Sequence, residues 1–153
     1  YQHIFPFFRY AEVLLNYAEA LAAATQNPDF TGMKGEVEYT LSPREALNAV
    51  RARYNMPGIT ETDYAAFVKR LRNERRVELA FEGHRFWDIR RWKIGAETTK
   101  VYGLTITPQN DGSFSYVRSV IQQRGWDDRM NYYPIADAEL FKNHNLVQND
   151  GWK

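Results

Sequence analysis

The 153-residue chain contains no cysteine, no long apolar run and no recognisable catalytic signature. Without cysteine there is no disulfide framework, no thiolate nucleophile and no cysteine-ligated zinc or iron–sulfur site. No apolar run approaches the ~18 residues that a membrane-spanning helix needs, which excludes such a helix. The three histidines lie outside any nucleophile–base context, and the HExxH, P-loop, GxGxxG and EF-hand patterns are missing. We therefore expect a protein that is not an enzyme and that binds no metal or cofactor.

What the chain does contain is a surplus of aromatic residues and an uneven distribution of charge. Hydrophobic residues make up 44% and aromatic residues 15%, more aromatics than the core of one domain requires. A net charge of +1 conceals a basic block at 69–93, in which nine Lys/Arg and four acids occur, with Phe86, Trp87 and Trp92 interleaved among them. Such a block fits either a nucleic-acid surface or helices whose charges pair with one another. The interleaved acids favour pairing, so we expect no nucleic-acid partner.

Apolar spacing predicts two helices in the first third of the chain. At 7–24, apolar and small residues recur every three or four positions, which indicates a helix that another helix can approach closely. A long connection is expected at 25–41. The second helix begins after the N-cap Ser42, with Pro43 at its first position and Glu45 completing a capping box.

Two further helices are predicted at 62–82 and at 84–93. The longer one carries apolar residues on two sides, so it is either packed between neighbours or kinked near Asn73. We favour packing between neighbours. On this helix Arg75 is expected to pair with a carboxylate such as Glu78, because buried charges must be paired.

The pattern changes after residue 95. Alternating residues around an Asn-Asp-Gly turn predict a β-hairpin at 100–121. An irregular aromatic loop is expected at 122–135, followed by a short helix at 137–141 and a polar tail at 143–153.

Side chains of the hairpin and the aromatic loop are the candidate ligand-binding residues. Flat aromatic faces can pack against the CH faces of sugar rings, while polar side chains hydrogen-bond the hydroxyl groups. The candidates are Tyr102, Tyr116, Trp126, Arg129 and Tyr132, with Tyr133 beside them. The alternative is that the same aromatic residues cover the helical scaffold.

Four stretches of the chain follow a family pattern in the same order. The most specific is NERRVELAFEGHRFWDIRRW at 73–92. The others are RYAEVLLNYAEA at 9–20, ALNAVRAR at 46–53 followed by Met-Pro, and YYPI with NHNLVQNDGW within 132–152. The tail departs from the pattern where His144 and Asp150 occupy positions at which the family often has proline. In these stretches the chain resembles the SusD/RagB family of nutrient-binding outer-membrane lipoproteins of Bacteroidetes.

The resemblance implies a mostly α-helical fold on a tetratricopeptide-like scaffold, with a β-hairpin and long loops near the C-terminus. It implies that residues 1–153 are the C-terminal part of a SusD/RagB-like domain, with the signal peptide and the lipid-attachment cysteine upstream. Within this part we expect a helical region at 7–93, a hairpin and loop region at 94–135 and a C-terminal tail at 136–153. The matching stretches are scaffold, and their charges are interpreted as a structural ion network of Glu12, Arg75, Glu78, Glu82, Arg85 and Asp88.

The resemblance also implies a function. SusD-like proteins capture oligosaccharides, or in some cases peptides, at the cell surface and work with a SusC-like TonB-dependent β-barrel transporter. We therefore expect a surface-exposed outer-membrane lipoprotein that binds oligosaccharide or polysaccharide, with membrane association only through a lipid anchor outside this chain. The alternatives are peptide capture, a tetratricopeptide-like docking scaffold without a glycan site, and a glycoside hydrolase.

Overall fold

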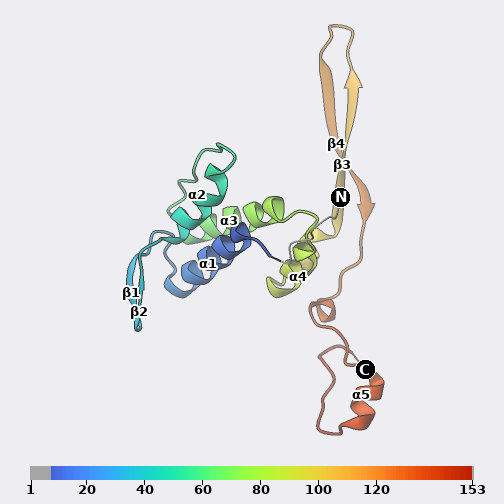
Figure 1. The fold of residues 1–153 in the computed structure, drawn as a ribbon. Coiled ribbons are helices and arrows are strands. Elements are labelled where there is room, and N and C mark those ends of the chain that lie inside the picture. The colour runs from blue at the N-terminus through green and yellow to red at the C-terminus, as the bar shows by residue number, and fades with distance from the viewer. Residues whose placement is uncertain (1–7, 153) are drawn as a thin grey trace, which may run out of the picture. The chain divides into compact units, whose positions relative to one another are not determined.

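The computed structural model describes residues 8–152, which form a first unit ending at His84 and a second beginning at Arg85 (Figure 1). Helices dominate the first unit, and a long β-hairpin dominates the second. Within the described range, no helix combines the length and the apolar character that crossing a bilayer requires.

The first unit is a helical core in which α1 (Tyr10–Thr25) packs against α2 (Pro43–Ala52) and α3 (Tyr64–Glu78). The apolar stripe predicted for the first helix is confirmed, because its small and apolar residues from Ala11 to Ala22 are buried at three- and four-residue spacing. Small residues on α1 allow the close helix approach that the sequence predicted. The largest fully buried side chains of the core are Leu15, Leu47, Val50, Phe67 and Leu71.

Two side-chain caps define where α2 and α3 begin. The Ser42 hydroxyl accepts a hydrogen bond from the Glu45 backbone N–H at 3.2 Å, and the Glu45 carboxylate accepts one from the Ser42 backbone N–H at 2.8 Å. This is the predicted capping box, and it is confirmed. Asp63 caps α3 by accepting a hydrogen bond from the Ala66 backbone N–H at 2.8 Å.

The first unit differs from the prediction in its connection and in the end of α3. The connection contains a small hairpin, β1 (Gly32–Lys34) paired with β2 (Val37–Tyr39), whose three-residue strands are too short for a clear alternation signal. The prediction of a helix packed on two sides up to residue 82 is wrong. The helix ends at Glu78, Phe81 adopts a positive φ of 66°, and Val77 and Phe81 are exposed.

Two aromatic residues that continue the apolar spacing of the first two predicted helices lie outside the core. Phe8 precedes α1 and is exposed, and Tyr54 follows the end of α2 and is exposed. Both stand beyond a helix end, where the helical spacing no longer determines which way a side chain points.

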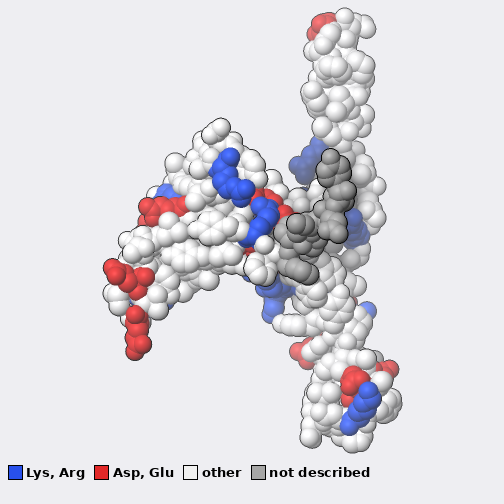
Figure 2. All heavy atoms as spheres, in the orientation of Figure 1, with Lys and Arg blue, Asp and Glu red and all other residues white. Residues whose placement is uncertain are grey.

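The second unit begins with most of α4 (His84–Arg91) and the short helix η1 (Gly95–Thr98). The hairpin of β3 (Lys100–Pro108) and β4 (Phe114–Gln123) follows, in register from Lys100 opposite Gln123 to Pro108 opposite Phe114. The predicted hairpin is thus confirmed. Between its ends the only charged residues are Asp111 and Arg118, and Figure 2 shows this hairpin almost free of charged atoms below its acidic tip.

The chain then forms η2 (Asp128–Asn131), α5 (Asp137–Lys142) and a tail that folds back by hydrogen bonds. The Gln148 side chain brackets Ile135, donating to its carbonyl and accepting from its N–H, both at 2.8 Å. The Trp152 indole N–H donates to the carbonyls of Arg129 and Tyr132 at 3.1 Å each. The polar tail therefore supports the aromatic loop.

Candidate functional site

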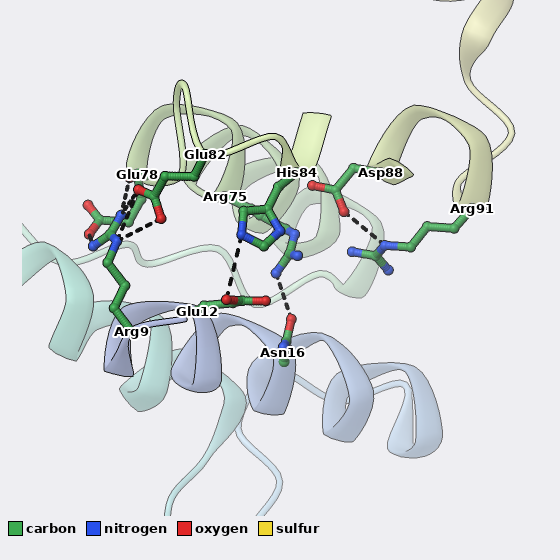
Figure 3. A network of polar contacts seen from close by, with 9 residues as sticks. All are labelled: Arg9, Glu12, Asn16, Arg75, Glu78, Glu82, His84, Asp88 and Arg91. Atoms are coloured by element: carbon green, nitrogen blue, oxygen red, sulfur yellow. Dashed lines mark hydrogen bonds and ion pairs between the residues drawn. The ribbon is translucent and has the colours of Figure 1, made fainter. Parts of the chain in front are cut away.

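The charged residues of the first unit join the start of α1 to the end of α3 (Figure 3). The Arg9 guanidinium donates to the Glu78 carboxylate at 2.5 Å and to the Glu82 carboxylate at 2.8 Å. It also donates to the Glu78 backbone carbonyl. The hydrogen bonds to Glu82 contribute most, and those to Glu78 next, to raising the pKa of Arg9 above its already high ordinary value. Arg9 is thus a structural clamp that the sequence did not single out.

The other members of the expected ion network are also involved in polar contacts. Arg75 is buried and donates from Nη1 to the Asn16 side-chain oxygen at 2.6 Å, while Glu12 lies 3.5 Å from His84 Nε2. In the second unit, Asp88 is buried and accepts from Arg91 Nε at 2.9 Å. Arg85 is half-buried in α4. We interpret these residues as scaffold.

A surface pocket of about 380 Å³ lies in the second unit, between α4 and the loop around η2. From α4 and the turn after it the pocket is lined by Trp87, Arg90, Arg91 and Lys93. From the end of η2 and the following residues it is lined by Asn131, Tyr132 and Tyr133. Its size lies in the range that holds a small organic ligand, and its wall combines flat rings with cations.

Aromatic rings form one continuous wall at this pocket. Trp87 packs edge-on against Phe86, with ring centroids 5.1 Å apart, and Tyr133 lies 6.0 Å from Phe86 and 6.2 Å from Trp87. Trp87 and Tyr133 are both more than half exposed, at 59% and 57%. A ligand can therefore reach their faces without displacing the fold.

Next to the pocket, a tryptophan packs on a glycine. Gly95 is buried, and a side chain at this position would meet the Trp126 ring at 1.9 Å. Trp126 is itself half-buried and lies 5.5 Å from the Arg90 guanidinium. The loop therefore attaches to the segment after α4 through the Trp126 ring.

The structure separates the residues that the sequence proposed for ligand binding. Tyr132 lines the pocket, whereas Trp126 packs on Gly95 next to it. Tyr102 and Tyr116 lie on one face of the β3–β4 hairpin, both exposed. Arg129 lies over the Trp152 ring at 4.9 Å and holds the tail. Tyr132 of the proposed set thus lines the pocket, together with the neighbouring Tyr133.

Sequence reasoning missed Trp87, Arg90 and Lys93 as site residues. They belong to the basic block at 69–93, which was interpreted as paired helical charges. The available signal was that this block has more cations than acids near its C-terminal end. No cluster of three or more potential metal-ligating side chains occurs among residues 8–152.

Comparison with known proteins identifies relatives over nearly the whole chain. A family profile described as the SusD family matches residues 1–152. "SusD-like protein P2" of Formosa agariphila is 33% identical over 146 residues, which is 93% of this chain and 24% of the relative.

Two crystal structures show the same fold. A SusD-like protein from Bacteroides fragilis is 35% identical with a TM-score of 0.71, covering 95% of this chain and 25% of the other. A SusD superfamily protein from Parabacteroides distasonis is 25% identical with a TM-score of 0.55, covering 95% and 26%. The chain therefore spans about a quarter of the length of these relatives.

These matches confirm the predicted fold class, a mostly α-helical, tetratricopeptide-like scaffold with a β-hairpin near the C-terminus. The sequence motifs at 9–20 and 73–92 contribute to α1, α3 and α4, the helices that carry the ion network and one side of the pocket. The chain belongs to the SusD family.

Proposed function

We propose that the protein binds oligosaccharides or polysaccharides without catalysing their cleavage, and that the pocket between α4 and η2 contacts the sugar. The observation that carries the proposal is the exposed ring wall of Trp87 and Tyr133 beside polar groups, in a chain of the SusD family. Sugar rings present apolar CH faces and a rim of hydroxyl groups. Such a ligand matches flat aromatic rings surrounded by hydrogen-bonding side chains.

Family membership supports a proposal about the cellular location of the protein and its partner. We propose that the protein acts at the outer surface of the bacterial outer membrane and passes its ligand to a SusC-like, TonB-dependent transporter. The 153 residues contain no cysteine, so the lipid anchor of this proposal attaches elsewhere in the protein. Tyr102, Tyr116 and Trp126 remain proposed ligand contacts outside the pocket, and Arg129 is proposed to act with them.

Binding can be tested with the protein and a panel of oligosaccharides, by isothermal titration calorimetry and tryptophan fluorescence. We expect Trp87→Ala to weaken binding at least tenfold, because one stacking face is lost. Because Trp87 is exposed, the thermal midpoint should change little. Incubation with the same panel should release no reducing sugar.

Trp126→Ala provides the comparison for stability. Its ring packs on Gly95, so the variant should lower the thermal midpoint more than Trp87→Ala does. Failure of every glycan to bind, with a peptide or a partner protein binding instead, would replace glycan capture by one of the other functions. Equal glycan affinity in Trp87→Ala and the unmodified protein would remove this pocket from the proposal.

A further inference from the structure

The pocket between α4 and η2 carries positive charge that no described acid neutralises. Three cations line it, and one of them, Arg91, pairs with the buried carboxylate of Asp88 at 2.9 Å. Neither Arg90 nor Lys93 forms an ion pair with any residue from 8 to 152, and no Asp or Glu lines the pocket. Positive charge beside the binding face favours a ligand group that carries negative charge.

The guanidinium of Arg90 is held in place by aromatic rings. Its central carbon lies 3.5 Å from the centroid of Phe86, 5.5 Å from Trp126 and 5.9 Å from Tyr133. Its Nη1 donates to the Phe86 carbonyl at 2.9 Å, and its other N–H groups have no described acceptor. A guanidinium fixed in this way loses little side-chain entropy when it binds an oxyanion.

Lys93 and Asn131 complete the polar part of the pocket. Lys93 is exposed, and its ammonium lies 5.8 Å from the centroid of Tyr132. Asn131 donates from Nδ2 to the Asp128 carbonyl at 2.8 Å, while its Oδ1 is buried and accepts no hydrogen bond from the described residues. A buried acceptor without a partner calls for a donor such as a hydroxyl group.

We infer that this pocket selects a sugar residue that carries an anionic substituent, either a carboxylate or a sulfate ester. Arg90 and Lys93 bind the anionic group, Asn131 Oδ1 accepts a hydrogen bond from a ring hydroxyl, and Trp87 and Tyr133 pack against the ring. Charge-assisted hydrogen bonds to an oxyanion are stronger than those to neutral hydroxyls, so charge becomes the basis of selectivity. This inference rests on the proposed glycan-binding function and adds the class of glycan to it.

The test compares matched probes that differ only in charge. One pair is trigalacturonate and its methyl ester, and the other is a carrageenan tetrasaccharide and its desulfated form. We expect at least one charged probe to bind about tenfold more tightly than its neutral counterpart, with an affinity that falls as salt is added. The pair that shows the difference identifies the substituent as carboxylate or sulfate.

Lys93→Met is the decisive variant, because it removes the charge of an exposed side chain and keeps most of its length. It should remove most of the tenfold preference for the charged probe over its neutral counterpart. Lys100→Met removes the charge of an exposed lysine outside the pocket lining, and it should leave the preference for the charged probe unchanged. Arg90→Lys keeps the charge but loses the planar fork, and it should reduce the preference as well.

The outcomes separate this inference from the function on which it rests. Equal affinity for charged and neutral probes, unaffected by Lys93→Met, overturns the anionic selectivity and leaves glycan binding in place. Absence of binding by all four probes, together with the failure of the wider glycan panel, overturns both. A charge preference that persists in Lys93→Met and in Arg90→Lys also overturns the inference, because other cations then create it.

Discussion

The two units of the chain are stabilised in different ways. Every buried hydrophobic side chain of the described residues lies in the first unit, from Ala11 to Leu79. In the second unit the buried residues between 85 and 152 are Asp88 and Gly95. That unit instead relies on the β3–β4 ladder, on side-chain hydrogen bonds to the backbone and on contacts between exposed rings.

This difference suggests that the first unit contributes most of the stability, whereas the second provides the surface for ligand binding. Apolar burial is the dominant favourable term in folding, and a two-stranded hairpin is only marginally stable on its own. The rings that the second unit leaves exposed are therefore available to a ligand, whereas Phe67 of the first unit is used in the core. We expect substitutions in the first unit to affect the free energy of unfolding and substitutions in the second to affect local structure and binding.

The largest effect on stability is expected from Phe67→Ala. Phe67 is fully buried in α3, so its removal leaves a cavity in the helical core. We expect the free energy of unfolding to fall by about 3–5 kcal/mol. Urea denaturation followed by circular dichroism at 222 nm measures this change.

Phe114→Ala is the matched control in the second unit. Phe114 is 55% exposed on the hairpin, so its loss should cost less than about 1 kcal/mol. Similar losses from the two substitutions would contradict the contrast between a buried core and an exposed aromatic surface.

An intermediate effect is expected from Arg51→Met. Arg51 pairs with Glu74 at 2.5 Å, and both side chains are only 11% exposed. Without Arg51 the Glu74 carboxylate remains nearly buried and unpaired, which should cost about 2–3 kcal/mol. The double substitution Arg51→Met with Glu74→Met should recover part of this loss in the same urea titration.

Arg70→Met tests whether burial makes the loss of an ion pair costly for stability. The Arg70–Glu61 pair, like the Arg51–Glu74 pair, joins a guanidinium to a carboxylate, here at 2.8 Å, but the Arg70 side chain is 53% exposed. Its loss should cost less than about 1 kcal/mol. If Arg70→Met proves as costly as Arg51→Met, burial does not determine the strength of these pairs.

Local sequence signals predicted those features that depend on neighbouring residues. Ser42 and Glu45 are three positions apart, so their capping box is readable from the sequence, as is the hairpin turn at residues 110–112. The predicted end of α3 was wrong because no helix-stop residue, such as glycine or proline, follows Glu78 directly. Phe81 has a positive φ without being glycine, which no sequence rule anticipates.

The candidate pocket was harder to predict because it joins residues about 40 positions apart. The ring centroids of Trp87 and Tyr133 lie 6.2 Å apart, although the β3–β4 hairpin lies between the two residues in the chain. The sequence identified Tyr132 by its aromatic loop, but it could not show that Arg90 has no carboxylate partner among residues 8–152. Whether two charged residues far apart in the chain form a pair depends on the tertiary structure, which the spacing of residues along the sequence does not reveal.

A smaller and more local effect is expected from Gln148→Ala in the second unit. Gln148 makes both side-chain hydrogen bonds to Ile135, and its oxygen also accepts from the Asn149 N–H at 2.9 Å. We expect a loss of about 1 kcal/mol that is confined to the loop and tail. Hydrogen exchange should become faster at the Ile135 amide.

The same exchange experiment sharpens the comparison between the units. Amides of α1 and α3 should keep their protection in Gln148→Ala, since the helical core does not depend on the tail hydrogen bonds. Gln122→Ala, in the exposed part of β4, should leave Ile135 protected. Loss of protection in α1 would show that the units unfold together.

The smallest effect is expected from the pH dependence of the capping box in the first unit. The backbone N–H and the hydroxyl of Ser42 donate to the Glu45 carboxylate and hold its pKa below the ordinary value of 4.5. A lowered pKa in the folded state means that this stabilisation is fully present above pH 4.5. It is lost as the pH falls through the lowered pKa, because the carboxyl group then becomes protonated.

Glu45→Gln isolates this contribution, since the amide does not titrate. Thermal midpoints of the variant and the unmodified protein should differ at pH 7, with the unmodified protein higher, and should converge as the pH falls below 4.5. A gap that widens on acidification would show that the carboxylate is not the stabilising form. Because Glu45 is exposed, this cap acts at the edge of the core, so its effect should stay well below that of Phe67→Ala.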